Sequence, residues 1–269
     1  MLRLGWFSTG RGEGSLGLLQ KVQGAVESGE LSAQIQFVFS NREPGEAEAE
    51  GSDHFFQQVK DYGIPLVTLS SQRFRRERDG GPFSRHRLEF DREAMRRLDG
   101  YESDLCVLAG YGLITDVEMC NRYTMLNLHP ALPDGPVGTW QQVIWEVIEA
   151  KAQEAGAYIH LATEDLDRGP VLTYYSFPLR GRAFDELWKQ IEGRSTGDLK
   201  TTEGQELPLF QLIRHEGIRR ERPLLLETLK AFAQGDIRLE GRRPVDGSGG
   251  PIGGLCLNEA IERVLQESG

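Results

Sequence analysis

Short apolar runs alternate with amphipathic stretches along the first two thirds of the chain. Apolar runs typical of buried strands occur at 2–7, 35–39, 64–69, 105–110 and 125–130. Between these runs, apolar residues recur with i, i+3, i+4 spacing, which predicts helices over 18–26, 55–62, 87–98 and 140–150. Alternation of strands and helices predicts an α/β fold with a mostly parallel, twisted sheet and helices on both faces.

The pattern changes toward the end of the chain. Two more strands are expected at 156–162 and 171–179, joined by 163–170, and the Arg-rich stretch 73–82 is expected to be a loop. Beyond them we expect helices at 184–191, 223–232 and 258–265, a polar insertion or hairpin at 193–207, and a Gly/Pro-rich connector at 241–254. The chain is thus predicted to hold an α/β core (1–182), an insertion and a helix completing that core (183–240), and a connector with a terminal helix (241–269).

Composition narrows the range of partners. The 269 residues include 31 Lys and Arg against 41 Asp and Glu, a formal net charge of −10, which argues against a nucleic-acid partner. Three widely spaced cysteines without a C-x-x-C motif fit a reducing compartment. The sequence shows neither a signal-peptide pattern nor an apolar run long enough to span a membrane. We therefore expect a cytoplasmic protein without a membrane partner.

The segment Asn127-Leu128-His129-Pro130 carries the strongest chemical signal. On a strand, Asn127 and His129 point to the same face, and Pro130 ends the strand where ligands bind in open α/β sheets. An amide donor beside an imidazole suits the stabilisation of an oxyanion while a proton moves. Taken alone, the pattern is more often an asparagine that caps a turn and a buried structural histidine than a catalytic pair.

An acidic loop follows at 163–171 and contains three carboxylates in four residues. By itself such a loop is an ordinary solvated turn. A carboxylate placed next to His129 would instead hold the imidazole in position and favour its charged form.

Together, the N-x-H-P segment and the later L-D-x-G-P-V loop resemble the folate-dependent formyltransferase family, and within it the formyltransferases that act on glycinamide ribonucleotide. The resemblance covers most of 2–180 and returns weakly at 218–239. Supporting matches lie in the glycine-rich turn after the first strand and in the segments 38–42, 87–93 and 104–111. The resemblance implies a Rossmann-like formyltransferase fold with a C-terminal extension.

The resemblance also implies the reaction and its residues. A formyl group would pass from 10-formyltetrahydrofolate, the co-substrate, to a primary amine, first of all glycinamide ribonucleotide in purine biosynthesis. Asn127 and protonated His129 would donate hydrogen bonds to the oxyanion, and Asp167 would stabilise the imidazolium. We expect no metal, which agrees with the absence of His or Cys residues at ligand spacing. The folate site implied by the family consists of Arg87, Leu108, Ala109, Gly110, Tyr111, Leu113, Thr163, Glu164 and Asp165.

The glycine-rich turn 10–15 has the composition of an anion site at a helix N-terminus. A dinucleotide site is the other interpretation of such a turn, but the second strand ends at 40–42 without the acidic residue that this site requires. By resemblance, Gly12, Gly14 and Ser15 hold the acceptor's phosphate, and Arg11 assists.

Two departures from the family concern the acceptor. Ala131 replaces the family's serine after His-Pro, and Asp134 adds an acidic residue to the same loop. The family's Glu-His pair before a proline has no clear counterpart in the basic segment 215–223, where Glu216 or Glu221 would substitute. We assign Glu216 to the substrate, although a basic helix is more often a solvated surface.

The expected partners are therefore small molecules, a folate and a phosphorylated amine, bound by a monomer or homodimer. Three alternatives stay open: formyl transfer to another amine such as an amino sugar nucleotide, hydrolysis of formyltetrahydrofolate, and non-catalytic binding of a folate or nucleotide. Binding alone would not require Asn127, His129 and Asp167 together, which argues against the last of these.

Overall fold

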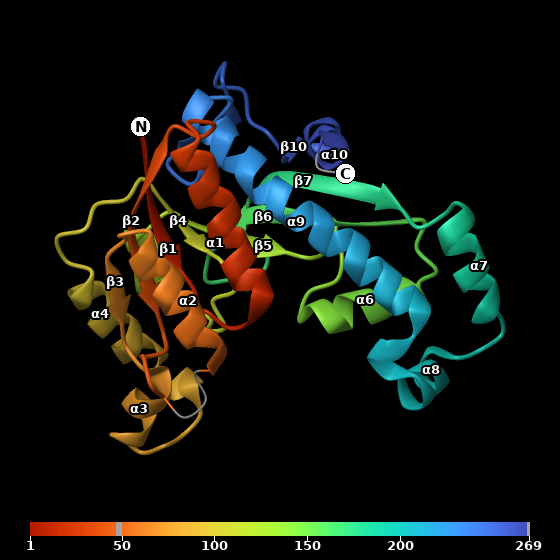
Figure 1. Cartoon of the computed structure of the whole chain (residues 1–269), viewed down its shortest axis with the longest axis horizontal. Helices are drawn as coiled ribbons and strands as arrows, with labels where there is room; N and C mark the ends of the chain where they lie inside the picture. Colours follow the sequence, from red (N-terminus) through yellow and green to blue (C-terminus); the bar gives the residue numbers. More distant parts are fainter. Residues whose placement is uncertain (47–49, 268–269) are drawn as a thin grey trace. The chain divides into compact units, whose positions relative to one another are not determined.

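The computed structural model describes residues 1–46 and 50–267. The chain forms two compact units, the first made of Met1–Asn127, Leu161–Gly169 and Leu229–Arg238, and the second of Leu128–His160, Pro170–Thr228 and Leu239–Gly269. Figure 1 shows the course of the chain.

The first unit is built on a parallel sheet. Its strands are β1 (Leu2–Phe7), β2 (Ala33–Ser40), β3 (Leu66–Thr68), β4 (Leu105–Leu108) and the first three residues of β5 (Met125–His129), in the order β5-β4-β1-β2-β3. The chain proceeds from β1 outward to β3 and then returns to place β4 on the other side of β1. The carboxyl ends of β1 and β4 therefore form the switch point at which ligands bind in open α/β sheets.

Helices cover both faces of this sheet. Helices α3 (Ser71–Arg76), α4 (Arg87–Arg97) and α5 (Val117–Arg122) share a buried cluster with Phe7, Phe37 and Phe39 of the strands. Leu4 and Trp6 point to the opposite face and are fully buried. Helices α1 (Gly12–Glu27) and α2 (Glu50–Asp61) run side by side in front of the strands in Figure 1.

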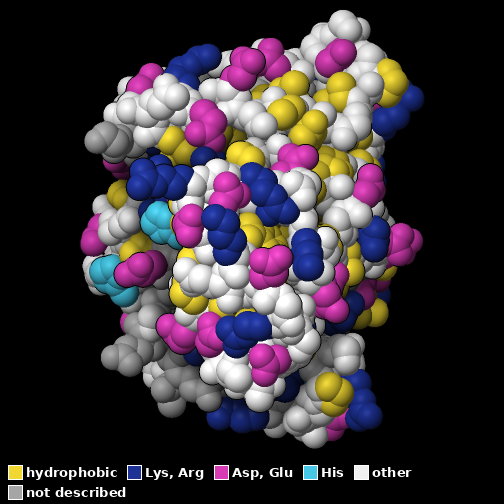
Figure 2. Space-filling model, turned by 90° about the vertical axis from the view of Figure 1, so that its right-hand side faces the viewer, with side chains coloured by type: hydrophobic (Ala, Val, Ile, Leu, Met, Phe, Trp, Pro, Cys, Tyr) yellow, Lys and Arg dark blue, Asp and Glu magenta, His cyan; other side chains and the backbone are white. Residues whose placement is uncertain are grey.

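The second unit contains the end of β5 and an antiparallel pair formed by β6 (Glu154–Leu161) and β7 (Val171–Pro178), in register at Tyr158 and Tyr174. Strand β10 (Leu255–Cys256) pairs in parallel with β7. Its helices are α6 (Trp140–Glu149), α7 (Arg182–Gln190), α8 (Thr196–Thr202), most of α9 (Pro208–Gln234) and α10 (Asn258–Glu267). On the face in Figure 2, acidic and basic side chains are interspersed.

Two sequence expectations about local structure were wrong. The supposed loop 73–82 begins inside α3, whose N-terminus is capped by Ser70: its Oγ accepts a hydrogen bond of 3.0 Å from the Arg73 N–H. The polar insertion 193–207 contains helix α8, capped in the same way by Ser195, and a 3₁₀ turn (Gly204–Glu206) instead of a hairpin. Polar helices with few apolar positions lack the periodicity that the sequence interpretation used.

Two boundaries also moved. Helix α9 begins at Pro208, well before the expected start at 223, and contains Pro223. The connector 241–254 includes β9 (Arg243–Asp246), which pairs with β8 (Ile237–Glu240) as a small separate sheet. The strands over 2–7, 35–39, 105–110 and 125–130, and the helices over 87–98, 140–150 and 258–265, were confirmed within a few residues.

Cys106, Cys120 and Cys256 are all free, as the sequence led us to expect. Among the residues that the structure describes, no helix combines the length and apolar character needed to cross a membrane.

Candidate active site

Strand β5 carries two residues of the expected catalytic trio at its carboxyl end. Asn127 is the last residue of β5 in register with β4, where it lies opposite Leu108. His129 follows two positions later, so strand geometry gives both side chains the same facing. Pro130 comes directly after the last strand residue, as predicted.

Asn127 is joined to the third member of the trio. Its Nδ2 donates a hydrogen bond of 3.1 Å to Oδ1 of Asp167. An amide nitrogen has two N–H groups, and this bond fixes the plane of the amide. Asp167 itself has φ 54, a left-handed conformation uncommon outside glycine and found at functional turns.

The loop that presents Asp167 is held tightly against its own strand ends. The Ala162 N–H donates to the Met125 carbonyl at 2.8 Å, which ties the start of the loop to β5. At the other end, a Cβ added to Gly169 would lie 1.7 Å from the Leu161 carbonyl oxygen. A glycine is therefore required at position 169, where the loop passes close to the Leu161 backbone. Glu164 and Asp165, which were expected to contact folate, are exposed.

His129 belongs to the second unit and is 3% exposed. Its Nε2 lies 2.8 Å from the carbonyl oxygen of Pro136. Because a carbonyl oxygen only accepts, this contact assigns the Nε2 hydrogen and makes Nδ1 the acceptor nitrogen of the neutral ring. The ring also lies 5.3 Å from that of Tyr158.

The loop 130–136 brings the Pro136 carbonyl back to the imidazole. The Gly135 N–H donates to the Leu132 carbonyl at 2.9 Å, and Asp134 has φ 63. Aspartate tolerates this left-handed conformation better than most residues. Asp134 is exposed, so its place in the turn accounts for this departure from the family's sequence.

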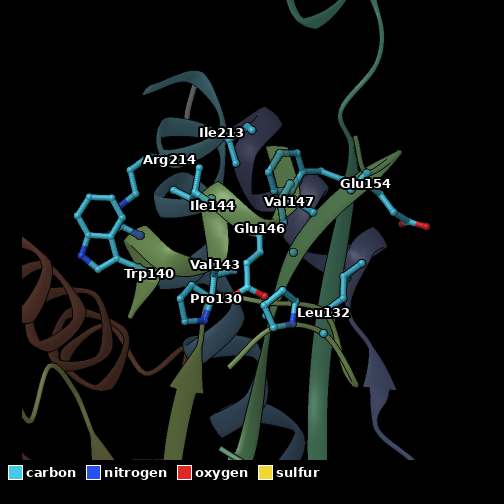
Figure 3. A pocket seen from close by; sticks show the side chains of 18 of the residues that line it. Pro130, Leu132, Trp140, Val143, Ile144, Glu146, Val147, Glu154, Ile213 and Arg214 are labelled. Carbon is cyan, nitrogen blue, oxygen red and sulfur yellow. The ribbon is translucent and has the colours of Figure 1, made fainter. Parts of the chain in front are cut away.

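An apolar pocket of about 170 Å³ lies beside this loop, within the second unit (Figure 3). Val143, Ile144 and Val147 of α6 line it, with Pro130 and Leu132 below them in the figure. The sequence predicted the apolar face of α6 but could not show that part of it borders a cavity.

Two glutamates of α9 are held by arginines. Glu221 lies 2.9 Å from Arg214, at the edge of the same pocket, and burial raises its pKa against the opposing charge of Arg214. Burial also works to raise the pKa of Glu216, but hydrogen bonds and charges from Arg220 and Arg219 lower it overall. The Glu216 carboxylate, proposed for the acceptor, is thus an ionised partner of two arginines at 2.7 and 3.1 Å.

The glycine-rich turn opens α1 as expected. The helix begins at Gly12, and Gly12 and Gly14 are exposed with open space where a side chain would stand. Ser15 is buried, and its hydroxyl donates to the Arg11 carbonyl at 3.3 Å. The N-cap residue Arg11 makes no side-chain hydrogen bond to the first turn, so the N–H groups of this turn stay the element predicted to bind an anion.

The segment after β4 is bound closely to the segment after β1. The Ala109 N–H donates to the Phe7 carbonyl at 2.9 Å, and the Ala109 carbonyl accepts from Ser8 Oγ at 2.7 Å. The Gly110 carbonyl accepts from the Thr9 N–H at 3.1 Å. Both main-chain groups of Ala109 and the carbonyl of Gly110 are therefore bonded within the unit. The Leu108 side chain, also assigned to the folate site, is half-buried.

Gly110 should be the most sensitive glycine of this segment. It has φ +66, and a Cβ would lie 2.2 Å from Ser15 Oγ. We expect Gly110→Ala to lower the free energy of unfolding by about 1 kcal/mol more than Gly100→Ala, which has φ +93 and open space. Chemical denaturation measures the difference. Adding Ser15→Ala to Gly110→Ala should restore the lost free energy of unfolding. Equal losses in Gly110→Ala and Gly100→Ala would contradict the close approach of Ser15 to Gly110.

A buried carboxyl group lies among three expected folate residues. Burial raises the pKa of Asp91 to about 7, opposed by a 2.5 Å hydrogen bond from the Asp116 N–H and by the charge of Arg87. Asp91 in turn adds to the effect of burial in raising the pKa of Tyr111. The Tyr111 ring packs on Phe7 at 5.8 Å, so this side chain belongs to the core cluster that Leu113 also contacts.

Asp91 should make stability depend on pH. Its pKa is higher in the folded protein than in the unfolded chain, so the stability it contributes is complete below pH 4 and is lost as pH rises to about 7. We expect Asp91→Asn, which keeps an acceptor for Asp116, to gain about 4 kcal/mol over wild type between pH 4 and pH 8. Denaturation curves at both pH values test this. Asp99→Asn, at an exposed position, is the control and should show no such gain. If the stability of Asp91→Asn and of wild type changed with pH in parallel, the raised pKa would not belong to Asp91.

Burial raises the pKa of Cys106 to about 12, so its thiol stays neutral. In the described part of the chain no cluster of three or more His, Cys, Asp or Glu residues has the arrangement of a metal site.

Comparisons with known proteins identify the family of the chain. The model of the formyl transferase family matches residues 11–180. The phosphoribosylglycinamide formyltransferase of Escherichia coli is 28% identical over 179 residues, 65% of this chain and 74% of its own length.

Solved structures show the same fold. A phosphoribosylglycinamide formyltransferase from Coxiella burnetii superimposes with a TM-score of 0.67 at 21% identity, covering 95% of this chain and 98% of the other. A formyltetrahydrofolate deformylase from Burkholderia mallei gives a TM-score of 0.58 at 18% identity, covering 91% and 69%. The mostly parallel sheet with helices on both faces is the fold that these structures share.

Proposed function

We propose that this chain, which belongs to the formyl transferase family, transfers the formyl group of 10-formyltetrahydrofolate to the amine of glycinamide ribonucleotide, a step of purine biosynthesis. The hydrogen bond from Asn127 to Asp167 carries the proposal. Asn127 lies two residues before His129 on the same strand. The bond orients an amide donor two positions along the strand from an imidazole, and oxyanion stabilisation uses donors of both kinds.

In the proposed reaction, the acceptor amine attacks the formyl carbon and a tetrahedral oxyanion forms. The Asn127 amide and protonated His129 donate hydrogen bonds to this oxygen. Asp167 holds the Asn127 amide and offsets the positive charge of the imidazolium. Collapse breaks the bond from carbon to folate N10, and the proton released by the amine ends on that nitrogen.

The choice of acceptor rests on two observations. The relative from Escherichia coli carries the name of a phosphoribosylglycinamide formyltransferase. The first turn of α1 presents exposed glycines, which suit the phosphate of such an acceptor. The proposal also includes where the protein acts and which residues bind its substrates. It would act on small molecules in the cytoplasm. Arg87, Leu113 and Thr163 would belong to the folate site, and Gly12 and Glu216 to the acceptor site.

The test is release of tetrahydrofolate from 10-formyltetrahydrofolate, with and without glycinamide ribonucleotide. We expect release that depends on this acceptor. Equal release without any amine would instead show hydrolysis, the reaction named for the structurally similar deformylase. Release only with an amino sugar nucleotide would show that this compound, and not glycinamide ribonucleotide, is the acceptor. No release with any amine would reject the proposal.

A further inference from the structure

A second, cationic pocket of about 480 Å³ lies within the first unit, at the carboxyl ends of β4, β1 and β2. Arg11, Arg42 and Arg75 all line it, and no carboxylate among the described residues does. We propose that this arginine pocket binds an anionic group of a substrate, a phosphate or a carboxylate, an inference that rests on the proposed function.

The three arginines reach the pocket from separate elements. Arg11 follows β1, Arg42 follows β2, and Arg75 lies on α3. Arg42 is 8% exposed. Guanidinium groups match the geometry of carboxylate and phosphate oxygens, and a hollow lined by one sign of charge concentrates the opposite ion.

A hydrogen-bonded network makes the wall of the pocket rigid. Thr9 Oγ1 donates to Asn41 Oδ1 at 2.8 Å and accepts from the Gly112 N–H at 2.8 Å. Asn41 Nδ2 donates to Ser71 Oγ at 3.3 Å, and the Ser71 N–H donates to the Asn41 carbonyl at 3.0 Å. These polar side chains are at most 8% exposed. The segments after β1, β2 and β4 are thereby joined to α3, as a preorganised site needs.

Of the three arginines on α3, Arg75 alone lines the pocket. Arg73 turns to another surface, where it pairs with Glu43 and, at 3.7 Å, with Glu77. Arg75 is half-buried and lines the pocket, and within the described residues it forms no ion pair. Arg76 is exposed and lies outside the lining, which makes it a matched control on the same helix.

The position fits a substrate because the pocket spans the switch point between β1 and β4. Arg11 directly precedes the first residue of α1, and Leu113 belongs to the expected folate segment. Two sources supply the required anion: the phosphate of the acceptor, and the glutamate carboxylates of the folate.

Titration calorimetry on the full chain tests the proposal with inorganic phosphate and with tetrahydrofolate triglutamate as probes. We expect Arg75→Gln to raise the Kd of one probe about tenfold, and Arg11→Gln/Arg75→Gln to raise it further, while Arg76→Gln leaves both within about twofold. A change for phosphate assigns the pocket to the acceptor, and a change for the triglutamate assigns it to the folate.

Unchanged Kd values for both probes in Arg11→Gln/Arg75→Gln would overturn the proposal. Matching melting temperatures of wild type and variants confirm that the comparison is between folded proteins. Binding is measured without turnover, so the pocket and the proposed reaction can fail independently. A chain that binds phosphate through Arg75 but does not formylate glycinamide ribonucleotide would refute the reaction alone.

Discussion

His129→Ala is expected to lower kcat about 1000-fold. The substitution removes the donor that would face the oxyanion and the group that moves protons, and such groups typically contribute about 10²- to 10⁴-fold. The contact between Nε2 and the Pro136 carbonyl shows that the imidazole is held in one orientation, which is what a catalytic donor needs. Steady-state kinetics with 10-formyltetrahydrofolate and acceptor measure the effect.

Because His129 is 3% exposed, its loss also opens a cavity. The melting temperature of His129→Ala must therefore be compared with wild type, and imidazole in the assay should restore part of the activity if the loss is chemical. His54→Ala, at an exposed position of α2, is the matched control and should retain full activity. Activity of folded His129→Ala within about fivefold of wild type would show that the assignment is wrong.

Asp167→Asn is expected to lower kcat about 100-fold with little change in stability. Asparagine tolerates the left-handed backbone at φ 54, and its amide oxygen still accepts from Asn127 Nδ2. The substitution thus removes mainly the negative charge that would stabilise a histidinium. Steady-state kinetics and chemical denaturation separate the two effects.

Asp134→Asn is the matched control, since Asp134 is an exposed aspartate with φ 63. It should leave kcat unchanged. The double variant Asn127→Ala/Asp167→Asn should lose much less than the sum of the single losses, because both act through one hydrogen bond. Additive losses, or an Asp167→Asn variant as active as wild type, would contradict the role given to this carboxylate.

Sequence patterns predicted the parts of the site that lie on strongly periodic elements. The runs at 105–110 and 125–130 are β4 and β5, and they place Leu108 beside Asn127 in the sheet. The bond between Asn127 and Asp167 joins residues 40 positions apart, one from each of the two motifs, whereas the sequence led us to expect Asp167 beside His129. Strand alternation and a recognisable loop therefore sufficed for this part.

Features that depend on irregular backbone could not be predicted. The Pro136 carbonyl reaches His129 only because Asp134 adopts a left-handed conformation in the turn, which no periodicity reveals. The arginine pocket was hidden for another reason: α3 has too few apolar residues to be recognised as a helix, so Arg75 was assigned to a loop. Burial of Tyr111 in the core depends likewise on packing among distant aromatic rings.

The central claim is transfer of the formyl group to glycinamide ribonucleotide, and the fate of that group tests it most directly. The enzyme is incubated with 10-formyltetrahydrofolate labelled in the formyl carbon, with and without the acceptor, and the label is followed into formylated amine and free formate. We predict label in formylglycinamide ribonucleotide when the acceptor is present, and intact formyl-folate when it is absent. Label released as formate at the same rate with and without the acceptor would contradict the account.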